Sequence, residues 1–253
     1  MIETISNDIE VYTLKDKTDI GPAADAFLCG RITLMKVGSV FSIVYNPNIA
    51  GLTEKICVLK GRQNKQFMSV VCTYNQAKRI VDENRVNEDF YRLSPDFSSR
   101  AIVRIPVKRN TTLPFPYNEE EGTLQFLDFE KAHSLRNAFR EELVSRGCAI
   151  IPITSGNIHG ASTVEDLESA KRLAALFNMK AAFLDMDTVQ TIVVDIPQDK
   201  GDHKGSFMII SFCNPYAIEV KRLANKTDRE TTERHIAQLL ENTIMKTPLL
   251  YAL

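Results

Sequence analysis

The sequence predicts an α/β or α+β fold, in which helices flank a twisted, mixed β-sheet. Strand-like and helix-like segments interleave along the chain without strict alternation, which is typical of this class. The chain has 253 residues, of which 44% are hydrophobic, enough for one large domain with a substantial core. Its net charge of −1 excludes a global field that would draw it onto DNA or an anionic membrane.

The first half of the chain contains five expected strands and three expected helices. Pro22 near the start and Gly30 at the end bound the first helix. A turn at 37–39 joins the second and third strands. Apolar periodicity and β-branched runs predict strands at 10–14, 32–35, 40–45, 67–72 and 101–105, and helices at 23–29, 49–59 and 74–82.

The second half begins after a proline-rich, acidic segment at 107–122, which we expect to be an exposed loop. Ser162 and Glu165 have the spacing of a capping box, which predicts that a helix starts there and continues to Phe177. The helix predicted at 228–245 has an apolar stripe, which we interpret as part of the core in preference to a partner interface. The same patterns predict strands at 123–127, 148–153, 181–184, 191–196 and 206–212, and further helices at 134–144 and 228–245.

Cysteine and histidine usage argues against disulfides and metal sites. The five cysteines lie far apart in sequence, and we interpret them as reduced core residues. The four histidines show no ligand spacing, so no metal site is predicted. No apolar run approaches the roughly 20 residues that span a bilayer, and the N-terminus lacks the pattern of a secretory signal. We therefore expect a cytoplasmic protein without a membrane partner.

Two polar segments point to phosphate binding. The strand at 148–153 ends in Thr154-Ser155-Gly156-Asn157, where small residues let backbone N–H groups approach an anion. Lys60-Gly61-Arg62 follows a helix, with Lys65 just beyond, and these cations can reach one polyphosphate. The alternatives are structural. Serine and asparagine in loops often bond their own backbone, and cations at a helix C-terminus stabilise its dipole.

Together the two segments resemble the YrdC-like domain family of threonylcarbamoyl-adenylate synthases. That family carries K-x-R after a helix, matched by Lys60 and Arg62, and S-x-N after a central strand, matched by Ser155 and Asn157. Lys65 matches its second lysine. Segments 40–48, 132–139 and 191–196 match further motifs in the family's order, so the resemblance spans residues 22–210.

The resemblance implies a twisted, mostly parallel sheet flanked by helices, over residues 21–212. Residues 1–20 would be an N-terminal extension and 213–253 a C-terminal helical extension. The family uses ATP, Mg²⁺, bicarbonate and L-threonine to make threonylcarbamoyl-AMP and pyrophosphate for a tRNA modification. By this resemblance the phosphate- and nucleotide-binding residues would be Lys60, Arg62, Lys65, Ser155 and Asn157, and the amino-acid or acyl pocket would include Ser39, Thr154 and Thr191.

Departures from the family leave the function open between two classes. The threonine-contacting signature is replaced by Lys36-Val-Gly-Ser-Val-Phe-Ser-Ile43, and the arginine expected near 125–127 is absent. One hypothesis is an ATP-dependent, adenylate-forming nucleotidyltransferase. The other is a non-catalytic module with a degenerate site that binds double-stranded RNA or phosphate. Its basic face would comprise Lys60, Arg62, Lys65, Lys78, Arg79, Arg104, Lys108 and Arg109.

Overall fold

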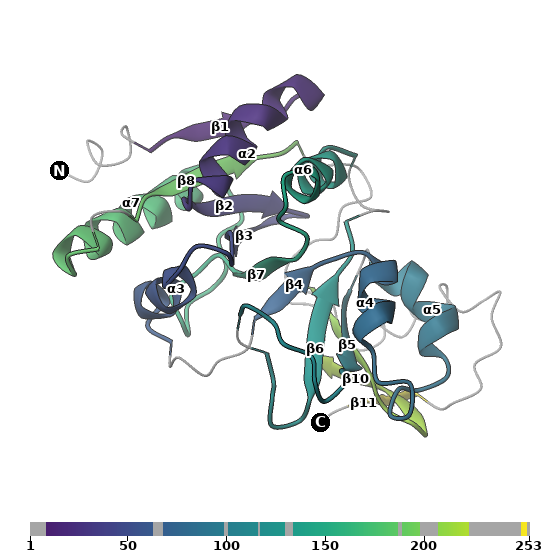
Figure 1. Ribbon diagram of the computed structural model, residues 1–253. Helices are drawn as coiled ribbons and strands as arrows, with labels where there is room; N and C mark the ends of the chain where they lie inside the picture. Colours follow the sequence, from purple (N-terminus) through teal and green to yellow (C-terminus); the bar gives the residue numbers. More distant parts are fainter. Residues whose placement is uncertain are drawn as a thin grey trace. The chain divides into compact units, whose positions relative to one another are not determined.

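The computed structural model describes residues 9–62, 68–98, 101–115, 117–129, 134–186, 189–197, 207–222 and 249–251. Backbone contacts divide the chain into two compact units. Unit 1 comprises Met1–Gln66 and His133–Asp202, and unit 2 comprises Phe67–Ala132 and His203–Leu253. Each unit contains a mixed β-sheet flanked by helices (Figure 1). The predicted α/β class is therefore confirmed.

The sheet of unit 1 has the strand order β1-β8-β2-β3-β7. These strands are β1 (Val11–Thr13), β8 (Thr191–Asp195), β2 (Ile32–Val37), β3 (Val40–Val44) and β7 (Ile151–Ser155). β8 is parallel to both β1 and β2, whereas β3 is antiparallel to β2 and β7. Every side chain of β3 is buried, as expected for a strand covered on both faces.

The helices of unit 1 pack in two pairs. The first pair is α2 (Ile20–Leu28), which follows the short helix η2 (Lys17–Asp19), and α6 (Ser134–Ser145), where the Phe27 and Phe139 rings meet edge to face at 6.1 Å. The second pair is α3 (Leu52–Lys60) and α7 (Leu167–Phe183). There the Lys180 ammonium donates to the carbonyls of Val58 and Leu59, at 2.8 and 3.0 Å. The Val58 carbonyl also accepts from the Gly61 N–H at 3.0 Å, so the Lys180 bonds add to the closure of the last turn of α3.

The sheet of unit 2 has the order β4-β6-β5-β9-β10-β11. Its strands are β4 (Ser69–Val71), β6 (Thr123–Leu127), β5 (Ile102–Pro106), β9 (Ile209–Asn214), β10 (Ala217–Arg222) and β11 (Leu249–Tyr251). Two helices, α4 (Tyr74–Ile80) and α5 (Phe90–Phe97), belong to this unit. The buried Phe90 ring joins them to the sheet, because it contacts both Tyr74 and Phe212.

Two local predictions in the second half of the chain are wrong. Residues 181–184 are not a strand, because α7 continues through Phe183. Ser162 and Glu165 do not cap this helix: it starts at Leu167, and the Asp166 side chain accepts from the Ser169 N–H at 2.8 Å. Val164 is bonded instead to Phe41 and Gly156, which holds this segment outside the helix.

The structure also contains elements that were not predicted, and one predicted helix cannot be compared with it. Helix α5 and strands β10 and β11 were not predicted. β9 crosses residue 212, where the sequence places the end of the main domain, and the helix predicted at 228–245 lies outside the described residues. None of the five cysteines forms a disulfide bond. Cys57, Cys72 and Cys148 are buried as predicted, whereas Cys29 is exposed and Cys213 half-buried. In the described part of the chain, no helix is long and apolar enough to cross a membrane.

Candidate functional site

The end of α3 places the two predicted cations. Gly61 follows the helix with a φ of +69°, in the left-handed region that glycine adopts without strain. Its N–H and that of Arg62 close the last turn, with the Arg62 N–H donating to the Cys57 carbonyl at 2.8 Å. Lys60 therefore lies in the final helical turn, and Arg62 begins the segment that leaves it.

A backbone hydrogen bond holds the polar loop after β7 against β3. The Gly156 N–H donates to the Phe41 carbonyl at 3.0 Å, and the Gly156 carbonyl accepts from the Val164 N–H at 3.1 Å. A Cβ atom at position 156 would lie 2.4 Å from the Phe41 carbonyl oxygen. Only glycine fits this approach, which explains the small residue between Ser155 and Asn157.

Lys60 is buried against this loop, with no exposed side-chain surface. Its ammonium donates to the Ser155 carbonyl, to the Asn157 carbonyl at 2.7 Å and to Asn157 Oδ1 at 3.0 Å. An ammonium has three N–H donors, so these three acceptors use all of them. Burial, and then the neighbouring Arg62 guanidinium, lower the pKa of Lys60 to about 7.

Arg62 is held by one of its nitrogens and leaves others unused. Nη1 donates to Thr154 Oγ1 at 2.8 Å. Nε is buried and has no hydrogen-bond partner. Burial lowers the pKa of Arg62, yet a guanidinium stays charged at neutral pH. Its Nε side therefore forms an oriented, positively charged donor edge beside the loop.

Ser155 and Asn157 bond mainly within the loop. Ser155 Oγ donates to Asn157 Oδ1 at 2.7 Å, and the Asn157 amide donates to the Ala161 carbonyl. The His159 N–H donates to the Lys60 carbonyl at 2.8 Å, a second link between the loop and α3. The structural interpretation of these residues is therefore supported, because the loop satisfies its own polar groups, and the functional interpretation stays a prediction.

Of the remaining predicted site residues, Ser39 lies near the loop after β7 and Thr191 does not. Ser39 lies in the β2–β3 turn, at the end of the sheet where β7 terminates. Thr191 lies elsewhere. Ser155 is level with Ser42, Met35 and Val194 in the strand registers, and Thr191 is three residues earlier in β8. That separation is about 10 Å along the strand, in addition to three strand spacings.

The structure brings together Lys60, Arg62, Thr154, Ser155 and Asn157, and Lys65 lies outside the described residues. One contributor was missed from the sequence: Lys180, which lies 121 residues after Leu59 and left no local signal. Among the described residues, no three His, Cys, Asp or Glu side chains are grouped to hold a metal ion.

Solved structures share this architecture. Sua5 of P. abyssi, complexed with L-threonine, aligns with a TM-score of 0.66 at 13% identity, covering 95% of this chain and 62% of that chain. YciO of E. coli aligns with a TM-score of 0.60 at 12% identity, covering 88% and 96%. HypF in a phosphate- and nucleotide-bound form aligns with a TM-score of 0.57 at 19% identity, covering 81% and 29%.

The chain has the YrdC-like fold. The fold expected from the two polar segments is therefore confirmed, and the low identities mark a divergent YrdC-like chain. The comparison with protein-family models gives no match, and neither does the comparison with curated proteins. This YrdC-like chain spans only 62% of the Sua5 structures, so their whole activity does not transfer with the fold.

Proposed function

We propose that this YrdC-like chain binds ATP at the Arg62 edge and uses it to form an acyl-adenylate. The supporting observation is the Arg62 side chain, anchored by Thr154 through Nη1 while its buried Nε has no partner. An anchored guanidinium offers two parallel donors, which match phosphate oxygens. A buried donor without a partner costs free energy, which a bound phosphate would recover.

In this proposal Lys60 is a positioning residue. Its three donors are already used by Ser155 and Asn157, so it has none left for a phosphate oxygen. Its role is to hold the loop in place. The hydrogen bond between the Ser155 and Asn157 side chains holds the loop beside Arg62 in one shape.

The proposed reaction starts from an amino-acid carbamate, formed from bicarbonate and the amine with loss of water. A carbamate oxygen attacks the α-phosphorus of ATP. The new O–P bond forms as the bond to pyrophosphate breaks, which gives a carbamoyl-adenylate and pyrophosphate. Arg62 would stabilise negative charge on the departing pyrophosphate. No protein nucleophile is needed, because catalysis rests on positioning and charge.

The solved relatives suggest the ligand classes. The Sua5 structure is complexed with L-threonine, and the HypF structure is in a phosphate- and nucleotide-bound form. We therefore propose an amino acid as acceptor. The resemblance of the sequence motifs adds a tRNA modification as the proposed downstream use. Ser39 is the hydroxyl kept from the threonine signature, and it lies at the end of the sheet where Ser155 lies.

The residues brought together here do not fit a protein-held Mg²⁺ ion. Mg²⁺ prefers carboxylate oxygens and water, and this site supplies an ammonium, a guanidinium, hydroxyls and an amide. Asn157 Oδ1 already accepts from Lys60 and Ser155. The site suits the phosphates of a nucleotide, and no step of the proposal depends on a metal ligand from the chain.

The direct test is pyrophosphate release from ATP in the presence of bicarbonate and a panel of amino acids that includes L-threonine. We expect release with at least one amino acid, and its loss in Arg62→Ala. A YrdC-like synthase of known activity serves as the positive control. Absence of release across the panel, while the control is active, would refute the adenylate-forming reaction and leave only nucleotide binding.

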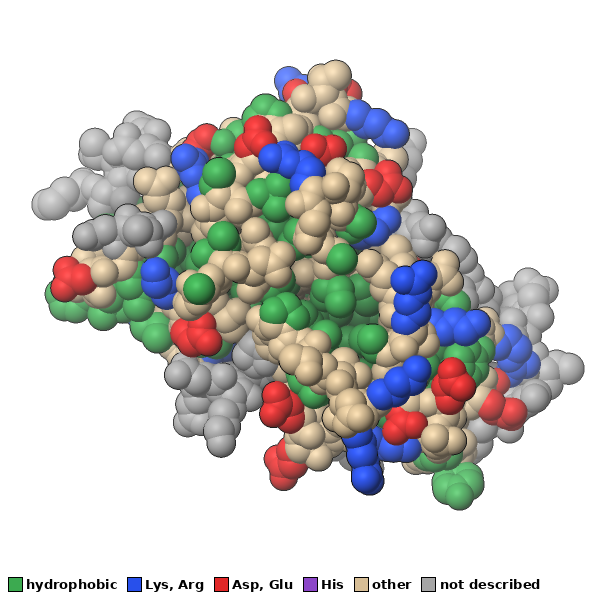
Figure 2. All heavy atoms as spheres, in the orientation of Figure 1, with side chains coloured by type: hydrophobic (Ala, Val, Ile, Leu, Met, Phe, Trp, Pro, Cys, Tyr) green, Lys and Arg blue, Asp and Glu red, His purple; other side chains and the backbone are tan. Residues whose placement is uncertain are grey.

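Binding of double-stranded RNA is the second candidate, and the exposed cations of unit 2 favour it. Figure 2 shows Lys and Arg side chains gathered over the region of α4 and α5. Lys78 and Arg79 are exposed there, and Lys108 donates to the Arg79 carbonyl at 3.1 Å. Two other expected contributors are engaged elsewhere, since Lys60 is buried and Arg104 is paired with Glu121.

The salt dependence of RNA affinity tests whether the exposed cations of unit 2 bind double-stranded RNA. Phosphate contacts release counterions, so affinity should fall steeply as salt rises, and Lys78→Ala with Arg79→Ala should reduce the slope by about two. Lys171→Ala with Arg172→Ala on α7 is the matched control, because it removes the same charges from another exposed helix face. An unchanged slope in the α4 variant would exclude this face.

A further inference from the structure

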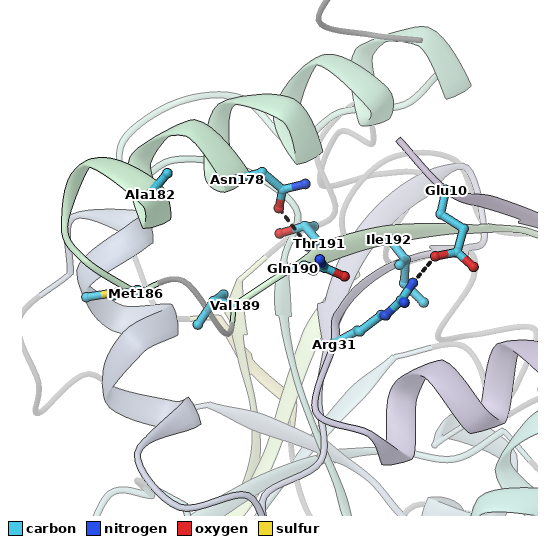
Figure 3. A pocket seen from close by; sticks show the side chains of 9 residues that line it. All are labelled: Glu10, Arg31, Asn178, Ala182, Met186, Val189, Gln190, Thr191 and Ile192. Carbon is cyan, nitrogen blue, oxygen red and sulfur yellow. Dashed lines mark hydrogen bonds and ion pairs between the residues drawn. The ribbon is translucent and has the colours of Figure 1, made fainter. Parts of the chain in front are cut away.

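A cavity lies in unit 1, between the end of α7 and the start of β8. Its volume is about 300 Å³, at the lower end of the range for small-molecule sites. Figure 3 shows its two ends: Ala182, Met186 and Val189 lie on one side, and the Arg31–Glu10 ion pair lies on the other. The cavity is therefore apolar at one end and charged at the other.

Polar groups without partners lie between these ends. Asn178 Oδ1 accepts from the Thr191 N–H at 2.7 Å, which fixes the amide and leaves its Nδ2 donors unused by any described residue. The Thr191 side chain also lines the cavity. Thr191 is only 2% exposed, and its Oγ1 has no hydrogen-bond partner. A buried hydroxyl without a partner is costly, and a ligand that bonded it would recover that free energy.

The charges restrict the kind of ligand. Arg31 donates to Glu10 Oε2, and the Tyr12 hydroxyl donates to Oε1, so the charged end is neutral overall. Both ionic side chains are partly exposed, at 33% for Arg31 and 48% for Glu10, so Arg31 can donate further hydrogen bonds and Glu10 can accept them. An anion would meet the Glu10 carboxylate, and a cation would meet the Arg31 guanidinium. A small zwitterion satisfies both.

We infer that this cavity binds an α-amino acid with an aliphatic side chain. The carboxylate would bond Arg31, the ammonium would bond Glu10, and the Asn178 amide would donate to a second carboxylate oxygen. The aliphatic side chain would lie against Ala182, Met186 and Val189. This site is separate from the Arg62 site, because Thr191 lies at the other end of the strands from Ser155.

The experiment is isothermal titration of the full chain, without ATP, using three probes of one shape. L-Leucine carries both charges, L-leucinamide lacks the carboxylate, and 4-methylpentanoate lacks the ammonium. We expect L-leucine to bind and each analogue to bind at least about tenfold more weakly, as expected for loss of a charge-assisted bond. Equal affinity for all three would overturn the zwitterion assignment, and no binding by L-leucine would overturn the site.

Three variants locate the binding. Arg31→Met and Asn178→Asp should each reduce L-leucine affinity about tenfold or more. The second keeps the oxygen that accepts from Thr191 while removing the amide donors. Arg146→Met is the matched control, because Arg146 forms an ion pair with Asp25 in the same unit at similar exposure.

Arg62→Ala separates this site from the proposed nucleotide site, since L-leucine affinity should be unchanged in that variant. Loss of binding in Arg62→Ala with retention in Arg31→Met would transfer the amino acid to the nucleotide site and overturn the inference. Retained leucine binding together with absent pyrophosphate release would refute the proposed function alone.

Discussion

The Lys60 ammonium bonds two oxygens of Asn157, a residue 97 positions later in the chain: the carbonyl at 2.7 Å and Oδ1 at 3.0 Å. Both residues belong to the predicted phosphate motifs. In the folded chain they bond each other, and the neighbouring Arg62 keeps a donor without a partner. The two cations of the K-x-R motif therefore have different roles, and each role can be tested separately.

Arg62→Ala should weaken ATP binding by about 1.5–3 kcal/mol, the usual loss for a charge-assisted hydrogen bond. The reason is the Nε edge, which Thr154 orients through Nη1. Isothermal titration measures the change. Arg172→Ala is the control, because its guanidinium also bonds a hydroxyl, that of Ser169, at 2.8 Å. Wild-type affinity in Arg62→Ala would remove this residue from the site.

Lys60→Met should lower the free energy of unfolding by about 1–3 kcal/mol, because buried acceptors lose their donor. Methionine keeps the apolar stem but leaves the Ser155 carbonyl and the two Asn157 oxygens without the ammonium. Urea unfolding measures the change, and Lys55→Met on the same helix is the control, since Lys55 is only half-buried. A variant as stable as the wild type would show that the loop does not depend on Lys60.

The stability of the protein should depend on pH through Lys60. Its pKa falls from the ordinary 10.5 to about 7 in the folded state, mainly because of burial. Between these two values the unfolded chain binds more protons than the folded one, so the Lys60 contribution to stability rises as pH increases above about 7. Urea unfolding across this window should show a wild-type rise that Lys60→Met lacks. Parallel curves would contradict the lowered pKa.

Gly156→Ala should destabilise the chain by about 1–3 kcal/mol, the usual cost of forced overlap in a packed region. The added Cβ would lie 2.4 Å from the Phe41 carbonyl oxygen, so either β3 or the loop must move. Thermal unfolding and ATP titration together measure the effect on stability and on the site. Gly21→Ala in α2 is the control, because nothing lies within 4 Å of its added Cβ. Equal stabilities of the two variants would show that the loop tolerates the displacement.

Local patterns in the sequence were sufficient for much of the fold. A turn separates β2 from β3 as predicted, although Val37 still belongs to β2, and β6 at Thr123–Leu127 has the predicted bounds. Both follow from side-chain alternation and turn residues, which act over a few positions. The strand expected at 181–184 failed, because its apolar run also fits the last turn of a long helix.

The cluster of residues at the candidate site was predicted in part. Lys60, Arg62, Ser155 and Asn157 were singled out together and lie together, whereas Thr191 lies at the other end of the strands. The sequence alone determined which residue types stand at the end of α3 and after β7, since capping glycine and loop chemistry are local properties. Only the tertiary structure decided that Lys60 is buried and fully bonded, while the buried Nε of Arg62 has no hydrogen-bond partner. The reason is that burial and hydrogen-bond partners depend on segments about ninety residues apart, whose contact no local pattern specifies.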